Sequence, residues 1–401
     1  MKKKNLPKGP ALPKGFLFSA VEAAIKKPGR RDLALIYSET EAEMAGMFTT
    51  NRVKAAPVQL DMKRIRSGKG QAIIVNSGNA NACAGRQGMR DAREMAAAIA
   101  KELKLKQELV YVCSTGVIGV PLPMERIRKK VPELVSRLEK ETIHAAASAI
   151  MTTDTFPKVV SRKIRAGNRT GTLTGICKGA GMICPRMATM LCFLMTDLKV
   201  TKSALEKALR GAVSNSFNRI TVDGDMSTND TVLLMANGMA GGGVIRETSP
   251  AFKTFASALS AVASELSRLI VQDGEGATKT VEIEVKNALT AADAERAASA
   301  IANSLLVKTA LYGNDANWGR IMAALGYSGI ALREDRIDIS FGRVRVVKGG
   351  VATGRDREAA RVLRDKEITI TVDLHLGRAS SRILTCDLTE AYVRINAEYR
   401  T

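Results

Sequence analysis

The chain has 401 residues, enough for two or three packed units that each bury an apolar core. Residues of the set AVILMFWYC make up 45% and charged residues 25%, a balance that excludes a disordered tail and a membrane protein. The formal net charge is +21. Because no nucleic-acid-binding motif accompanies this charge, it indicates a solvated basic surface, with a polyanion-binding protein as the alternative.

The N-terminal segment is basic, but Pro7, Pro10 and Pro13 interrupt it and no apolar region follows as in a secretory signal. The longest apolar run near the middle of the chain, 190–195, is far shorter than the ~20 residues of a membrane helix. We therefore expect a cytoplasmic protein with no membrane partner.

Hydrophobic periodicity predicts interleaved strands and helices along the chain. Strands are expected at 71–75 and 109–113, helices at 89–104, 124–139 and 252–269, and a half-buried strand at 368–374. Because this order lacks a strict βαβ rhythm, it favours α+β layers over a doubly wound parallel sheet. The glycine run 241–243 is the predicted boundary between packed halves.

Common catalytic and metal-binding motifs are missing from the sequence. It contains no G-x-S-x-G elbow for a Ser-His-Asp triad, no Walker A loop and no G-x-G-x-x-G turn. The segment 223–230 resembles a calcium loop, but it has Thr228 at the glycine position and Leu234 at the final glutamate position. We expect no metal, and interpret 223–230 as a hydrogen-bonded turn that supports a site.

A glycine-containing loop from Lys178 leads through Pro185 and Ala188 to Thr189, which directly precedes a continuous apolar strand. If the Thr189 hydroxyl cut the Ala188–Thr189 peptide, the new α-amine, with an ordinary pKa of about 7.7–8.0, would supply a general base. No histidine would then be required. The residues alone also fit a threonine that simply begins a buried strand.

A second segment could stabilise negative charge. Residues 114–119, STGVIG, follow the strand expected at 109–113. A Thr-Gly turn can direct one hydroxyl and one backbone N–H at a developing oxyanion. Without other observations it would be an ordinary glycine turn.

Many sequence blocks, in order from end to end, make the chain resemble the ornithine acetyltransferase family, the bifunctional glutamate N-acetyltransferase and amino-acid acetyltransferase of arginine biosynthesis. The family fold is an α/β sandwich with paired sheets and an N-terminal-nucleophile-like, self-processing site. The blocks are NSGNANACAG at 76–85, STGVIG at 114–119, MTTDT at 151–155, KGAGM at 178–182, ATML at 188–191, DGDMSTND at 223–230, QDGEGATK at 272–279, YGNDANWGR at 312–320 and the final INAEYRT.

The resemblance implies that the enzyme cleaves itself between Ala188 and Thr189, leaving an α chain of residues 1–188 and a β chain of residues 189–401. Thr189 then carries the acetyl group, while Thr115 and Gly116 form the oxyanion hole. Family similarity implies a substrate site lined by a threonine of the 152–155 stretch (Thr152 or Thr153), Lys178, Thr189, Glu275, Asn396 and Thr401.

Two residues depart from the pattern expected of many relatives, Cys184 and Arg186. Both precede the cleavage point, so they bear on the rate of cleavage rather than on acetyl transfer. The family implies no cofactor, although acetyl-CoA could serve as a second acetyl donor. It also implies an α2β2 assembly of the two chains.

The implied substrates are N-acetylornithine and glutamate, which would use one site in turn by a ping-pong mechanism. Lys178 could meet the carboxylate of N-acetylornithine and Glu275 its side-chain ammonium. One rival remains within the same chemistry, an N-terminal-nucleophile aminopeptidase of the related β-aminopeptidase type, in which water replaces glutamate as the acceptor.

Overall fold

The computed structural model describes residues 10–398 except 27, 140–141, 167–168 and 185–189. The chain divides into two compact units. The first unit comprises Met1–Gly179, Arg186–Asn218 and Met226–Ser267, and the second comprises Ala180–Pro185, Arg219–Asp225 and Arg268–Thr401. The glycine run 241–243 lies within the first unit, and the longest segment of the second unit begins at Arg268.

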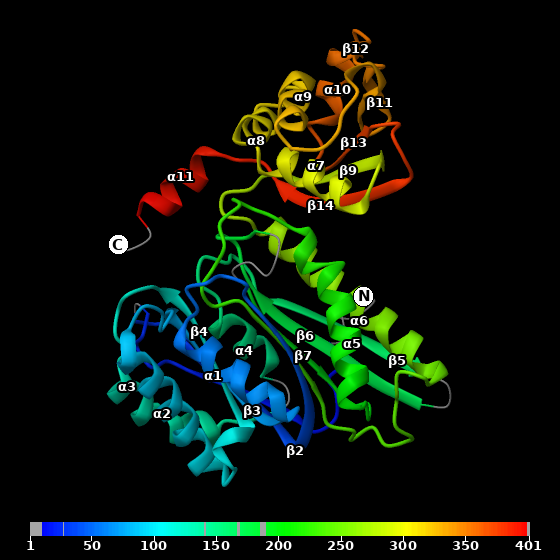
Figure 1. Cartoon of the computed structure of the whole chain (residues 1–401). Helices are drawn as coiled ribbons and strands as arrows, with labels where there is room; N and C mark the ends of the chain where they lie inside the picture. The colour runs from blue at the N-terminus through cyan, green and yellow to red at the C-terminus, as the bar shows by residue number, and fades with distance from the viewer. Residues whose placement is uncertain (1–9, 27, 140–141, 167–168, 185–189, 399–401) are drawn as a thin grey trace, which may run out of the picture. The chain divides into compact units, whose positions relative to one another are not determined.

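The first unit is built on an eight-stranded mixed sheet (Figure 1). Strands β3 and β4 pair in parallel, as do β7 and β8, and the other described pairs are antiparallel. The order is β4 (Val110–Val117), β3 (Lys69–Asn79), β2 (Leu33–Phe48), β8 (Thr231–Ala236), β7 (Leu191–Thr196), β6 (Arg169–Lys178) and β5 (Lys158–Ala166), with β1 (Phe16–Val21) paired to β2.

Alternate residues of these strands face two helical layers, as the two-residue repeat of a strand requires. On one face, Ile73 and Phe193 pack with the buried side of α4 (Ile143–Ala149). On the other face, Ile74 and Val112 share a core with three helices that lie together beside β3 and β4 (Figure 1). These helices are α1 (Ala56–Arg64), α2 (Gly85–Leu103) and α3 (Met124–Ser136).

The remaining long helices of the first unit are α5 (Lys202–Ser214) and α6 (Pro250–Gln272), whose last five residues belong to the second unit. The apolar stripe predicted for 252–269 lies on α6, and its residues Phe255, Leu259 and Leu266 are fully buried. Among the described helices, only α6 has the length and apolar composition to cross a membrane. Its buried stripe shows that core packing accounts for this composition.

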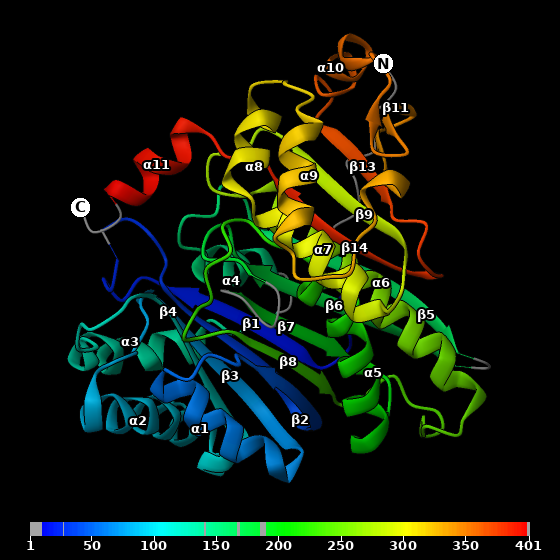
Figure 2. The same cartoon turned by 45° about the horizontal axis from the view of Figure 1, so that its top comes forward.

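The second unit holds a six-stranded sheet with helices α7–α9 packed against it (Figure 2). Strands β9 and β13 are parallel, and the other pairs are antiparallel. The strand order is β12 (Val351–Ala352), β11 (Val344–Lys348), β10 (Asp338–Phe341), β13 (Glu367–Asp373), β9 (Thr280–Ala288) and β14 (Ala379–Cys386). The helices are α7 (Ala291–Asn303), α8 (Leu305–Tyr312), α9 (Trp318–Gly326), α10 (Asp356–Val362) and α11 (Glu390–Ala397).

The structure confirms the predicted α+β class, a mixed fold with two sheets. The strands expected at 71–75, 109–113 and 368–374 lie in β3, β4 and β13. The helices expected at 89–104 and 124–139 correspond to α2 and α3, although α3 ends three residues early, at Ser136. Helix ends are set by local capping contacts, which periodicity alone does not locate.

Candidate active site

The segment Ser114–Gly116 lies at the C-terminal end of β4, where that strand runs parallel to β3. Gly116 has a φ of +134° and faces Gly78 in the register of the two strands. A Cβ at Gly116 would lie 2.2 Å from the carbonyl carbon of Gly78, so only glycine fits this close approach. Thr115, next to it, is 4% exposed. This arrangement suits the predicted oxyanion role, which stays a prediction.

The ammonium group of Lys178 lies beside this turn. Lys178 ends β6 and is 2% exposed, and its Nζ donates a hydrogen bond to Thr115 Oγ1 at 3.2 Å. The fold therefore brings together two residues that are 63 positions apart in the sequence. A buried cation beside a hydroxyl group can attract an anionic substrate group to this place.

Asp154 links the 151–155 segment to the end of β6. Its carboxylate accepts hydrogen bonds from Thr152 N at 3.0 Å, Gly179 N at 2.7 Å and Lys158 Nζ at 2.7 Å. Burial alone would raise the pKa of Asp154, but the ammonium groups of Lys178 and Lys158 and these hydrogen bonds lower that pKa to about 2. Asp154 therefore stays ionised and holds the loop of Thr152 and Thr153 against the residue after Lys178.

We predict that Asp154→Asn lowers the free energy of unfolding by ~3 kcal/mol at pH 7, because Lys158, fully buried, loses its carboxylate partner. The folded-state pKa of Asp154 is below its unfolded value, so its contribution is fully present above pH ~4 and is lost as the pH falls toward 2. Urea unfolding at several pH values should show the difference from the native chain shrinking over that window.

The matched control is Glu125→Gln, which breaks an ion pair with Lys129 whose side chains are both 73% exposed. Such a surface pair contributes ~0–1 kcal/mol, so the urea midpoint should barely move. Equal midpoints for Asp154→Asn and Glu125→Gln at pH 7 would contradict the structural role of Asp154.

The other described site candidates meet in the second unit. Glu275 is 8% exposed, and its N–H donates to Ala180 O at 2.9 Å. Asn396, on α11, donates from Nδ2 to Glu275 Oε2 at 2.7 Å. A Cβ at Gly181 would lie 2.3 Å from the Glu275 carboxyl carbon, so the loop backbone runs directly past this carboxylate. Glu275 and Asn396 together offer an acceptor for a cationic group and an adjustable amide.

The first part of the 223–230 segment supports the same loop. Asp223 accepts hydrogen bonds from Met182 N at 2.6 Å, Ile183 N at 2.9 Å and the Tyr392 hydroxyl at 3.3 Å. Burial raises the pKa of Asp223, although these backbone hydrogen bonds oppose the shift. Within the described ranges, no three His, Cys, Asp or Glu side chains are grouped so that they could hold a metal ion.

The predicted site residues thus form two clusters, one in each unit. Thr115, Gly116, Lys178, Thr152 and Thr153 belong to the first unit, and Glu275 and Asn396 to the second. The predicted Arg186, Ala188, Thr189 and Thr401 lie outside the described residues.

Sequence reasoning gave no individual role to Asp154, Lys158, Asn229 or Asp230, although it interpreted 223–230 as a hydrogen-bonded turn that supports a site. Asp154 lies between the threonines of MTTDT, and Asn229 and Asp230 end DGDMSTND. The sequence feature that could have identified all three is an acidic or amide residue beside hydroxyl residues. For Lys158 the sequence carries no such signal, because a buried lysine and an exposed lysine at a strand start look the same.

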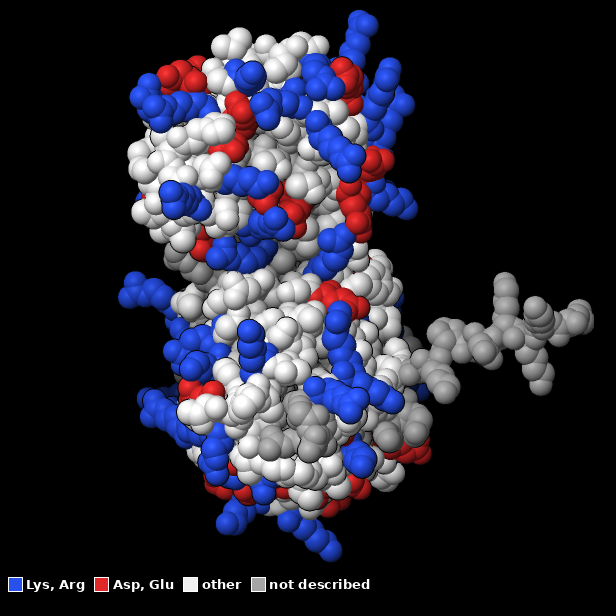
Figure 3. All heavy atoms as spheres, turned by 90° about the vertical axis from the view of Figure 1, so that its right-hand side faces the viewer, with Lys and Arg blue, Asp and Glu red and all other residues white. Residues whose placement is uncertain are grey.

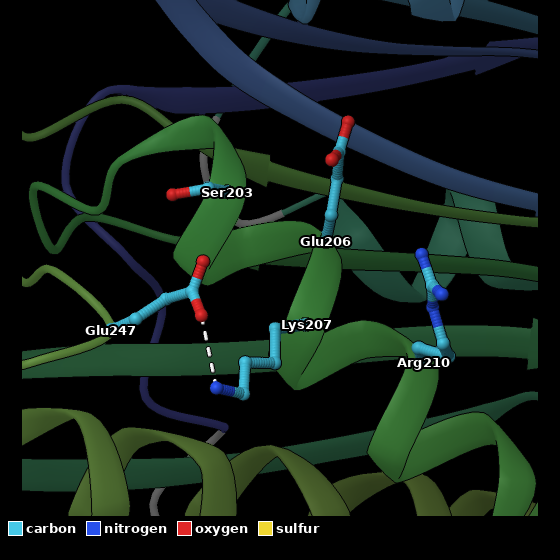
Figure 4. A pocket seen from close by; sticks show the side chains of 5 residues that line it. All are labelled: Ser203, Glu206, Lys207, Arg210 and Glu247. Atoms are coloured by element: carbon cyan, nitrogen blue, oxygen red, sulfur yellow. Dashed lines mark hydrogen bonds and ion pairs between the residues drawn. The ribbon is translucent and has the colours of Figure 1, made fainter.

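A surface hollow of about 280 Å³ lies elsewhere in the first unit (Figure 4). It is lined by Ser203, Glu206, Lys207, Arg210 and Glu247, and contains none of the predicted site residues. Lys207 pairs with Glu247 at 2.9 Å across it. On the face shown in Figure 3, Lys and Arg side chains are spread out, with Asp and Glu between them. Both observations suit a solvated charged surface.

In the first unit, a buried Thr-Gly turn beside a lysine suits acyl transfer; in the second unit, a carboxylate paired with an amide suits the binding of a cationic group. Comparison with known proteins agrees. A model of the ArgJ family matches residues 17–401. The arginine biosynthesis bifunctional protein ArgJ of Geobacter sulfurreducens is 58% identical, over 97% of this chain and 99% of its own. The arginine biosynthesis bifunctional protein ArgJ of Caldanaerobacter subterraneus subsp. tengcongensis is 52% identical, over 97% of this chain and 98% of its own.

Among solved structures, the arginine biosynthesis bifunctional protein ArgJ of Bacillus halodurans matches with a TM-score of 0.50 and 43% sequence identity. The match covers 51% of this chain and 97% of that chain. The chain belongs to the ArgJ family. This confirms the family predicted from the sequence, and with it the enzyme class, a bifunctional acetyltransferase of arginine biosynthesis.

Proposed function

We propose that this enzyme moves the acetyl group of N-acetylornithine to glutamate, giving ornithine and N-acetylglutamate, through an acetyl ester on Thr189. The observation that carries the proposal is the turn of Thr115 and Gly116 with the Lys178 ammonium on the threonine hydroxyl. It combines a group for an oxyanion with a buried cation for a carboxylate.

In the proposed first step, the Thr189 hydroxyl oxygen attacks the acetyl carbonyl carbon. The new C–O bond forms, the carbonyl oxygen becomes the oxyanion that Thr115 and the Gly116 N–H stabilise, and the amide C–N bond then breaks. The α-amine of Thr189 takes the hydroxyl proton and delivers it to the departing ornithine nitrogen. In the second step the neutral amine nitrogen of glutamate attacks the ester carbonyl carbon, the C–O bond to Thr189 breaks, and the α-amine of Thr189 passes the proton from the glutamate nitrogen to the Thr189 oxygen.

The α-amine becomes available only when the Ala188–Thr189 peptide is cut, so the mechanism requires an α chain of 1–188 and a β chain of 189–401. The match to the Bacillus halodurans structure supports this division. Nearly all of that solved chain aligns with 51% of this one, so it is about half as long. This is the length expected of one cleavage product.

We further propose that Glu275 binds the side-chain ammonium of N-acetylornithine, that Asn396 hydrogen-bonds to the backbone of either substrate, and that Thr401 and a threonine of 152–155 complete the site. Asn396→Ala leaves Glu275 Oε2 without its amide donor. It should raise the KM for both N-acetylornithine and glutamate by about tenfold, the effect of one hydrogen bond to a charged group. Steady-state kinetics of the cleaved protein measure this.

The control is Val393→Ala, which removes a 62% exposed side chain from the same helix, α11. Its KM values should equal those of the native enzyme. If Asn396→Ala also leaves both KM values unchanged, Asn396 plays no part in substrate binding.

Mass spectrometry tests the proposed function directly. Native protein given N-acetylornithine alone should release ornithine and gain one acetyl group on the chain that begins with Thr189. Adding glutamate should then remove the acetyl group and yield N-acetylglutamate. Release of acetate instead, with glutamate unused, would point to the hydrolytic rival of β-aminopeptidase type, and absence of any adduct would refute the acetyl-Thr189 intermediate.

Two further features follow from the same proposal. Acetyl-CoA in place of N-acetylornithine tests whether the enzyme also makes N-acetylglutamate from this donor, and native mass measurement tests the α2β2 assembly. We propose cytoplasmic action on small-molecule substrates, with no cofactor, nucleic-acid or membrane partner.

A further inference from the structure

The end of the 223–230 segment is buried in the first unit, directly before β8. Ser227, Thr228, Asn229 and Asp230 are between 0% and 8% exposed. Ser227 Oγ accepts a hydrogen bond from Asn229 N at 3.0 Å, and Thr228 Oγ1 donates to Asn229 Oδ1 at 2.5 Å. These contacts fix the orientation of the Asn229 side-chain amide, so its NH2 group points in one defined direction.

That NH2 group donates to two backbone carbonyls, one of the loop after β3 and one of β4. Asn229 Nδ2 donates to Ala80 O at 2.6 Å and to Ser114 O at 2.8 Å. Ser114 is the residue before Thr115, and its own Oγ donates to Asn76 Oδ1 at 2.6 Å. Asn229 therefore holds the backbone of the oxyanion turn at Ser114, the residue just before Thr115.

The adjacent residue, Asp230, holds the start of β7. Asp230 Oδ1 accepts a hydrogen bond from Met190 N at 2.9 Å, and Thr231 N donates to Met190 O at 3.1 Å. The N–H and the carbonyl of Met190 are thus bound by two consecutive residues, Asp230 just before β8 and Thr231 at its start. Met190 directly follows Thr189 in the sequence.

Asp230 differs from Asp61, a buried aspartate of helix α1. Asp61 uses both carboxylate oxygens on one backbone group, Val112 N, at 3.1 and 3.2 Å. In contrast, Asp230 Oδ2 has no hydrogen-bond partner among the described residues, although its side chain is 0% exposed. Burial raises the pKa of Asp230, although the Met190 N–H, the Lys178 ammonium and the Thr49 side chain favour its charged form.

We propose that Asn229 and Asp230 form a positioning pair that sets the distance between the oxyanion turn and Met190, the residue that follows Thr189 in the sequence. The inference rests on the proposed function, because it assigns the pair to that reaction. Adjacent residues of one buried segment hold Ser114 O and Met190 N, so a shift at one end is transmitted to the other through a single peptide unit. Acyl transfer needs this precision, since a displacement of ~1 Å between reacting groups can cost about 100-fold in rate.

The test compares Asn229→Ala, Asp230→Ala and Asp230→Asn in fully cleaved protein. Both alanine variants should lower kcat by about 10- to 100-fold while the KM values stay within twofold. Asp230→Asn should recover most of the rate, because its amide oxygen can still accept from Met190 N. The matched control is Asp61→Ala, another buried aspartate that binds a strand N–H, which should lose stability and keep its kcat.

Amide hydrogen exchange gives a readout that does not depend on activity. Asp230→Ala should speed exchange in the 114–117 segment, which Asp230 itself does not contact in any described hydrogen bond, whereas Asp61→Ala and Asp230→Asn should speed it less. If Asp230→Ala fails to fold, Asp230→Glu takes its place, since the longer side chain displaces the acceptor and should also lower kcat.

Unchanged kcat and unchanged exchange in the alanine variants would overturn the positioning pair, as would an equal loss of kcat in Asp61→Ala. A native enzyme that transfers no acetyl group would instead refute the proposed function. The exchange measurement would still decide whether Asn229 and Asp230 couple the two segments.

Discussion

Thr189→Ala is expected to abolish both self-cleavage and acetyl transfer, lowering the rate by about 10⁴-fold or more, as removal of a catalytic nucleophile does. Without the hydroxyl no ester can form, and without cleavage no α-amine is released to act as the base. Thr189→Ser should keep part of both activities, because serine retains the hydroxyl but lacks the methyl group that restricts its rotamer. Denaturing gels and acetyl-transfer assays measure the two effects.

The control for this experiment is Thr196→Ala, at the other end of β7. Thr196 is fully buried and its Oγ1 accepts a hydrogen bond from Leu198 N at 3.3 Å, so its loss should affect stability only. A Thr189→Ala protein that still cleaves and transfers would identify another nucleophile. Loss of cleavage in Thr196→Ala as well would show that any damage to β7 blocks processing.

The fold was predictable where one repeat dominated a segment. The alternation of Ile368, Ile370 and Val372 gave β13, and the three-and-four spacing of Phe255, Leu259 and Leu266 gave α6. Sheet order could not be predicted, because it depends on which strands find complementary partners across long loops. The division into units was also inaccessible, since the second unit takes two short segments, Ala180–Pro185 and Arg219–Asp225, from within the first.

The candidate site was predictable through family resemblance rather than through local pattern. The Thr115–Gly116 turn is recognisable as a block, but its contact with Lys178 depends on how β4 and β6 are placed in one sheet. The supporting roles of Asp154 and Asn229 depend on partners 25 and 115 residues away. No spacing rule relates such residues, so only the folded chain shows what they hold.

Gly116→Ala is expected to lower kcat by ~10²–10³-fold, the usual effect of losing one oxyanion donor. Gly116 has φ +134°, and an added Cβ would lie 2.2 Å from Gly78 C and 2.4 Å from Asn79 N. Both atoms belong to the backbone of β3, which cannot move aside as the end of a side chain can. The turn must therefore shift as a whole, carrying the Thr115 hydroxyl and the Gly116 N–H away from the reacting carbonyl.

Gly119→Ala separates this displacement from simple backbone strain. Gly119 also has a positive φ, +83°, but an added Cβ there has no neighbour within 4 Å. Alanine at Gly119 should cost ~1–2 kcal/mol of stability through its backbone conformation alone and leave kcat near the native value. Thermal unfolding and single-turnover acetylation of the cleaved proteins measure the two quantities. Equal kcat values for the two variants would show that the close approach to Gly78 has no part in placing the oxyanion donors, whereas a loss confined to Gly116→Ala ties catalysis to the contact between β3 and β4.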